Sequence, residues 1–166
     1  MKRLLAGLGL LALTASVACS NSATGPSQVS SKTSSGSTFN VVVRPSPITA
    51  THCNQQCPGD SSGSFAFSAD MTIDVQNSSG VGGTLSSITM TGTADGTTFP
   101  PLTFSSDEIK GQAGTIHVDA HATLSMPVTI VYNTPSGKAN LNISISLQIT
   151  DDGNKPVTAS GQVNVV

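Results

Sequence analysis

Residues 141–149 read Leu-Asn-Ile-Ser-Ile-Ser-Leu-Gln-Ile, the clearest structural signal in the chain. Every odd position is apolar, and every even position carries a small or medium polar side chain. A period of two residues is typical of a β-strand with one buried face and one solvated face. The stretch therefore predicts a strand in a sheet that covers a core on one side only.

The same alternation recurs on both sides of this stretch, from Phe39 to the end of the chain. It is clear over 65–75 and 157–165, and weaker over 41–43, 85–93, 98–104, 116–122 and 128–132. Turn signals such as Asp95-Gly96 and Pro135-Ser136-Gly137 separate the runs. Seven or eight short strands without long helices predict an all-β fold, an antiparallel β-sandwich.

Two positions interrupt the strand pattern. Pro127 has no N–H to give to a sheet, so we expect the strand to break there and the chain to bend or change sheets. Ser105 and Glu108 have the spacing of a capping box. They predict a helical connector of a turn or so, which Gly111 and Gly114 stop.

The composition disfavours several classes of protein. Charged residues make up 10% of the 166 residues and aromatic residues 4%, with no Trp. Helical bundles and nucleotide-binding α/β folds need long charged amphipathic helices, which this composition does not supply. Seven Lys and Arg against nine Asp and Glu leave no basic patch, so we expect no nucleic-acid partner. No cofactor motif occurs, and we expect neither enzymatic activity nor a cofactor.

The N-terminus has the pattern of an export signal. Lys2 and Arg3 precede the uncharged residues 4–17, which are too few to cross a bilayer of about 30 Å. Small residues at Ser16 and Ala18 fit the rule for signal cleavage. Residues 1–18 are therefore predicted to be a signal peptide.

The segment Ser16-Val17-Ala18-Cys19 resembles the lipobox of bacterial lipoproteins, although Ser16 stands where that family usually has Leu. The resemblance implies that Cys19 is lipidated and anchors the chain in the cell envelope. By the family's sorting rule, Ser20 after it implies the outer membrane, with the domain facing the periplasm or the outside. A plainly secreted protein is the alternative. Residues 19–38 would then form the anchor and a flexible Ser/Thr/Gly-rich tether, and 39–166 the sandwich.

Two cysteines remain once Cys19 is assigned to the lipid. Cys53 and Cys57 lie in a turn-rich stretch with C-x3-C spacing, which favours a local disulfide in an oxidising compartment. The alternative is a soft-metal site that joins His52 to both thiolates. The bridge would close a very short loop and stiffen it.

One strand carries a candidate metal site. His117, Asp119 and His121 alternate with apolar residues over 116–122, so a strand there would present all three on one face. Two imidazoles and a carboxylate suit Zn or Cu. An ordinary solvated sheet face is the other interpretation, and the one we favour.

Other polar groups give weaker signals. Asp151, Asp152 and Asn154 have too few oxygens and the wrong spacing for a calcium loop, so we expect a hairpin turn there. Asp70 and Asp74 lie on the solvated face of one predicted strand, too far apart for a glycosidase pair.

The stretch Ile149–Ala159 resembles the closing hairpin of bacterial immunoglobulin-like and fibronectin type III-like domains. With Pro45-Ser46-Pro47 after the first strand, the resemblance extends over 39–166. The chain departs from antibody-type domains, because it lacks a core Trp and a Cys pair that would bridge two sheets. The resemblance implies a binding, adhesion or structural module without a catalytic site. Its expected partner is an envelope protein or a cell-surface component, and a periplasmic metal-binding protein is the alternative.

Overall fold

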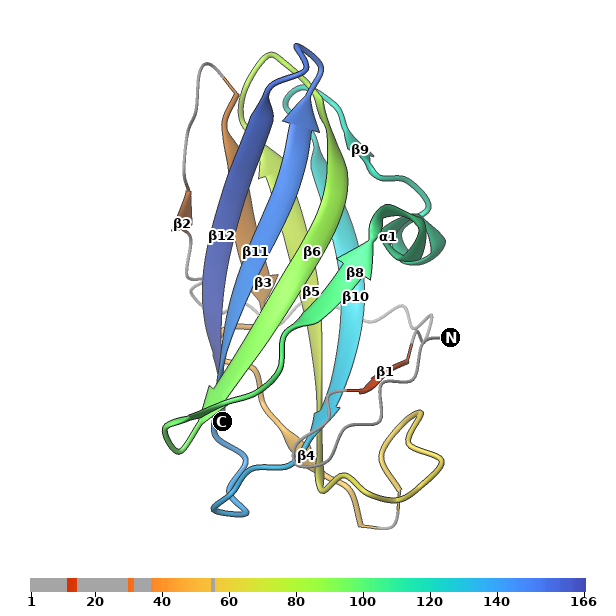
Figure 1. Cartoon of the computed structure of the whole chain (residues 1–166), viewed down its shortest axis with the longest axis vertical. Helices are drawn as coiled ribbons and strands as arrows, with labels where there is room; N and C mark the ends of the chain where they lie inside the picture. The colour runs from red at the N-terminus through yellow and green to blue at the C-terminus, as the bar shows by residue number, and fades with distance from the viewer. Residues whose placement is uncertain (1–11, 15–29, 32–36, 55) are drawn as a thin grey trace.

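The computed structural model describes residues 12–14, 30–31, 37–54 and 56–166, which contain twelve strands and one short helix. Two antiparallel sheets pack against each other (Figure 1). This confirms the predicted all-β antiparallel sandwich. The predicted lipidation site Cys19 and most of the predicted signal peptide and tether lie outside the described residues.

The first sheet is built around the pairing of two long strands. Its order is β1 (Ala12–Thr14), β10 (Thr123–Tyr132), β5 (Phe67–Asn77), β3 (Phe39–Arg44) and β2 (Ser30–Ser31), and β4 (Thr51–His52) also pairs with β5. The β10–β5 register places Leu124 opposite Val75 and Tyr132 opposite Phe67. Apolar side chains of both strands therefore alternate onto the same inner face.

The second sheet contains the strand predicted over residues 141–149. Its order is β12 (Pro156–Val165), β11 (Leu141–Asp151) and β6 (Gly83–Ala94), and the outer side of β6 pairs with β7 (Thr97–Thr98), β8 (Leu102–Ser105) and β9 (His117–Val118). A shift of register between Gln148 and Ile149 marks a bulge against β6.

The chain crosses between the sheets after β3. Ile48 forms a parallel bridge with Val165, and its N–H donates to the carbonyl oxygen of Asn164 at 2.8 Å. The strand order then matches that of an immunoglobulin-type sandwich. Strands A, B and E of that sandwich correspond to β3, β5 and β10. Strands C, F and G correspond to β6, β11 and β12.

The core fills the space between the two sheets with aliphatic side chains. The odd-numbered residues of β11 are all buried, as the alternation predicts. The sheets approach closely at Gly83, where a Cβ atom would lie 2.7 Å from Cζ of Phe39. The largest fully buried side chains come from both sheets: Tyr132, Phe39, Ile48, Ile73, Leu85, Ile88, Met90, Met126, Ile130, Ile143 and Ile145.

Two expectations about local structure are wrong. Strand β10 runs through Pro127 without a break. Only Thr129, Ile130 and Val131 of β10 pair with β1 on its outer side, and an edge strand tolerates proline because every second N–H points away from the sheet.

The helix α1 (Ser106–Ala113) is longer than the predicted connector of a turn or so. The capping box forms, and the Ser105 N–H donates to Oε2 of Glu108 at 2.8 Å. Gly111 does not end the helix, because burial of Ile109 holds this segment against the sandwich. The helix ends at Gly114, the second of the two predicted glycines, which adopts a φ of 80°.

One end of the sandwich, which we call the hairpin end, contains the β11–β12 turn, the β5–β6 turn and the chain entering β3 (Figure 1). There the Ser37 hydroxyl donates to Oδ2 of Asp151 at 2.6 Å. The predicted tether therefore meets the sandwich at this end. No helix in the described part of the chain is long and apolar enough to cross a membrane.

Candidate binding surface

The outer surface of the second sheet consists of neutral polar side chains. Strand alternation turns the even-numbered residues of β11 outward, and the neighbouring strands contribute the side chains in register with them. We call this surface the uncharged face. Its members are Thr84, Ser87, Thr89, Thr91, Thr93, Thr98, Thr103, Ser105, Asn142, Ser144, Ser146, Gln148, Thr150, Thr158, Ser160, Gln162 and Asn164.

Hydrogen bonds between neighbouring strands order part of the uncharged face. The amide of Asn142 donates to Oδ1 of Asn164 at 2.7 Å, and the Thr158 hydroxyl donates to Oε1 of Gln148 at 3.1 Å. The hydroxyls of Thr89 and Thr103 are 3.1 Å apart. These pairs fix side-chain orientations before any ligand arrives, which lowers the entropy lost on binding.

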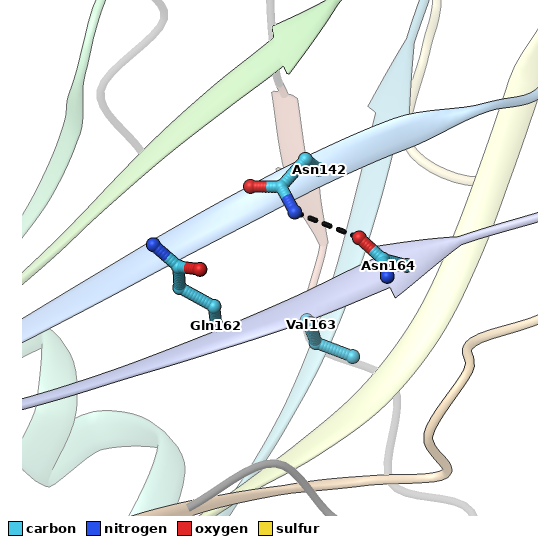
Figure 2. Close-up of a pocket in the computed structure, with 4 residues that line it drawn as sticks. All are labelled: Asn142, Gln162, Val163 and Asn164. Carbon is cyan, nitrogen blue, oxygen red and sulfur yellow. Dashed lines mark hydrogen bonds between the residues drawn. The ribbon is translucent and has the colours of Figure 1, made fainter. Parts of the chain in front are cut away.

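A shallow hollow lies at one end of this face, and Figure 2 shows Asn142, Gln162, Val163 and Asn164 around it. Its cavity volume is about 90 Å³. Pockets that enclose drug-sized ligands have volumes of roughly 300–1,000 Å³. The hollow therefore suits one projecting group of a larger ligand rather than an enclosed small molecule.

The outer surface of the first sheet has a different chemistry. Nε of Arg44 donates to Oδ2 of the buried Asp74 at 2.5 Å, and the Ser125 hydroxyl donates to the other oxygen of Asp74 at 2.7 Å. Asp70 accepts from the Thr129 hydroxyl at 2.5 Å. The two carboxylates are held by different partners, so they give no support to a glycosidase pair.

The strand expected over 116–122, which would have placed the candidate ligands on one face, is wrong, because β9 ends at Val118. The chain then turns: His121 has a φ of 57°, and the N–H of Ala122 donates to the carbonyl oxygen of Asp119 at 3.2 Å. His117, Asp119 and His121 therefore do not share a strand face. No three His, Cys, Asp or Glu side chains in the described ranges form a group that could hold a metal ion.

His117 instead links β9 to its neighbours at the hairpin end. Its Nε2 lies 3.3 Å from Oδ1 of Asp119, and its Nδ1 lies 3.8 Å from Oδ1 of Asp152 and 3.2 Å from the hydroxyl of Thr84. These contacts place the imidazole at the border of the uncharged face.

The predicted hairpin turn at 151–154 is confirmed. The N–H of Asn154 donates to the carbonyl oxygen of Asp151 at 2.8 Å, and the N–H of Lys155 donates to the Asp151 carboxylate at 2.8 Å. Hydrogen bonds from the Ser37 hydroxyl and from the Lys155 backbone lower the pKa of Asp151. This carboxylate therefore ties the start of the sandwich to its last hairpin.

The disulfide loop lies away from the hairpin end. The predicted Cys53–Cys57 disulfide is present, with Cα atoms 5.1 Å apart. His52 packs edge-on against the ring of Phe67, with centroids 5.3 Å apart, and is not brought into a thiolate site.

Asp60 organises the rest of this loop. It accepts from the N–H and hydroxyl of Ser62 at 2.9 and 2.5 Å and from the N–H of Phe65 at 3.0 Å. Burial acts to raise the pKa of Asp60, but these hydrogen bonds outweigh it and lower the pKa overall. The carboxylate therefore remains ionised as an anchor of the loop.

The uncharged face is the feature that our sequence reasoning missed. The alternation marks its residues as solvated, and the signal was the absence of Asp, Glu, Lys and Arg from every even position of 141–150. One strand alone does not show that its neighbours in space share this property. That knowledge requires the strand order.

Comparison with known proteins identifies the fold class alone. No protein-family model and no curated protein matches the chain. Among solved structures the chain is similar to Northeast Structural Genomics Consortium target SoR45, known from an X-ray structure. The two are 14% identical over 77% of this chain and 86% of that chain, with a TM-score of 0.56. At this identity the similarity shows a common sandwich fold and carries no function.

Proposed function

We propose that the protein is a lipid-anchored envelope protein whose sandwich is a non-catalytic binding or structural module. The observation that carries the proposal is the uncharged face, a wide and prearranged set of hydrogen-bonding side chains on a rigid sheet. Interaction surfaces built on strands hold their side chains more accurately than surfaces on loops. The expected partner is an envelope protein or a cell-surface component.

The use of the acidic side chains supports a non-catalytic role. Asp60 holds the disulfide loop, Asp74 pairs with Arg44, and Asp151 ties the hairpin to Ser37. Each carboxylate thus has a structural partner that accounts for its position. Catalytic acids and bases are recognised instead by facing a cleft in which a substrate could reach them.

The described part of the predicted tether lies along one edge of the sandwich. Residue Ser37 lies at the hairpin end, and the long strands run from there toward the disulfide loop (Figure 1). Before Ser37, Ser30 and Ser31 of the predicted tether pair with β3, so the described tether runs back along the edge of the first sheet. The uncharged face lies on the second sheet, where it would be open to a partner in the envelope.

Lipid attachment tests the anchoring part of the proposal. The full chain and a Cys19→Ser variant would be expressed in a bacterial host, fed a clickable palmitate analogue, and fractionated into membrane and soluble pools. We expect labelled wild-type protein in the membrane pool and unlabelled Cys19→Ser protein in the soluble pool. Unlabelled, soluble wild-type protein would contradict anchoring, and turnover of an envelope hydrolase substrate would contradict the non-catalytic role.

A further inference from the structure

Charge is distributed unevenly over the sandwich. Every Asp, Glu, Lys and Arg among the described residues lies off the uncharged face: in loops, in α1, on the first sheet or, for Asp151, buried at the end of β11. Lys155 and Asp152 sit at the tip of the hairpin, beyond the last members of the face. Away from its border at Ser105, whose hydroxyl donates to Glu108, the part of the face on β12, β11 and β6 thus offers no ionic partner to a ligand. A charged ligand would lose hydration there without receiving a counter-charge.

The face is nevertheless rich in hydrogen-bonding capacity. Hydroxyl and carboxamide groups both donate and accept, so each retains capacity after its bond to a neighbour. Rows of such groups repeat about every 4.8 Å across strands and about every 7 Å along them. Gln148, Thr158, Gln162 and Asn164 are exposed, which leaves their polar ends accessible.

Three classes of partner differ in the chemical groups that they would need on this face. A second copy of the chain would need an apolar centre in its interface, and the face has no large apolar member. A nucleic acid would need cations for its phosphates. An uncharged polysaccharide needs neither, because its hydroxyl and amide groups also donate and accept hydrogen bonds.

We infer that the uncharged face binds an uncharged polysaccharide chain, laid across β12, β11 and β6. The inference rests on the proposed binding function and names its ligand class. The hollow at Asn142, Gln162 and Asn164 receives one projecting group of a sugar unit (Figure 2). The face has no aromatic ring that could stack on a sugar. Several weak contacts, spaced along the polysaccharide, therefore bind it to the face.

A sedimentation assay tests this inference on purified protein. The full chain with Cys19→Ser, exported to an oxidising compartment, would be mixed with insoluble chitin, with insoluble cellulose and with heparin beads. We expect sedimentation with at least one of the two uncharged polymers and none with heparin. Raising the salt from about 0.05 to about 1 M should leave the binding unchanged, because screening acts only on charge.

Substitutions assign the binding to the face. Gln148→Lys/Gln162→Lys places two hydrated charges among its members, and we expect about tenfold weaker binding to the polymer that binds the wild type. Gln76→Lys, on the outer surface of the first sheet, is the matched control and should bind like the wild type. Circular dichroism and thermal melting would verify that both variants fold. If the double variant fails to fold, Gln162→Lys alone is expected to weaken binding by several-fold.

Three outcomes would overturn the inference. They are no binding to chitin or cellulose, binding that salt abolishes, and equal loss of binding in the Gln76→Lys control. Because this protein carries no lipid, such a result leaves the test of anchoring at Cys19 unaffected. The test of polysaccharide binding and the test of lipid anchoring can therefore fail independently of each other.

Discussion

Replacement of Asp60 by Ala should loosen the disulfide loop by a measurable amount. The substitution removes an acceptor that holds the N–H and hydroxyl of Ser62 and the N–H of Phe65. A hydrogen bond to a charged group contributes about 1.5–3 kcal/mol, and donors in a surface loop regain part of this from water. We therefore expect a loss of about 2–4 kcal/mol, a large share of a typical domain stability of about 5–15 kcal/mol.

Urea unfolding and amide hydrogen exchange would measure this loss. The exchange rate of the Phe65 amide reports the loop, and the urea midpoint reports the whole domain. Asp107→Asn, in the exposed first turn of α1, is the control and should change stability by less than about 1 kcal/mol. If Asp60→Ala leaves both observables within the range of the control, Asp60 does not organise the loop.

The pH dependence of stability gives an independent check on Asp60. Its pKa is lowered in the folded protein, so its contribution is present above the unfolded pKa of about 4. That contribution is lost as the pH falls through the lower, folded pKa. The wild type should therefore lose stability relative to Asp60→Ala only in this acidic window. A constant difference between the two proteins down to pH 2 would contradict the assignment.

Three further predictions concern packing and a buried phenol. Gly83→Ala should lower the free energy of unfolding in urea by about 1–3 kcal/mol, because the new Cβ would meet Phe39. Gly111→Ala in α1 places its new Cβ in open space and should raise that free energy by about 0.5–1 kcal/mol. Tyr132→Phe should cost about 1 kcal/mol, since the hydroxyl donates to the carbonyl oxygen of Ala139 at 2.6 Å. Burial raises the pKa of Tyr132 to about 12, so stability should fall between pH 10 and 12, and ultraviolet titration should show no phenolate below that range.

The sandwich could be predicted from the sequence because its strands follow a simple period. Residues 141–149 are one example, with Ile143, Ile145 and Leu147 fully buried. The incorrect expectations arose where the effect of a residue depends on its position in the folded protein. Pro127 breaks a central strand but not an edge strand, and its position at the edge is a property of the sheet order.

The candidate site was harder to predict, for two physical reasons. His117, Asp119 and His121 alternate correctly for a strand, but the chain turns at His121, so the three side chains do not share one strand face. The uncharged face, in contrast, joins side chains from strands up to 80 residues apart, such as Thr84 and Asn164. Its character emerges only when strand order and register are known.

Polysaccharide binding by the uncharged face can be tested by amide-resolved NMR of the Cys19→Ser protein. The protein is titrated with a soluble oligosaccharide of whichever polymer, chitin or cellulose, it binds in the sedimentation assay. We expect chemical-shift changes that saturate and that are largest at Asn142, Gln162 and Asn164, beside the hollow. They should spread along β11 and β12 and leave the first sheet unchanged. Shifts confined to the hairpin end around His117, or no shifts at the highest soluble concentration, would contradict binding by the uncharged face.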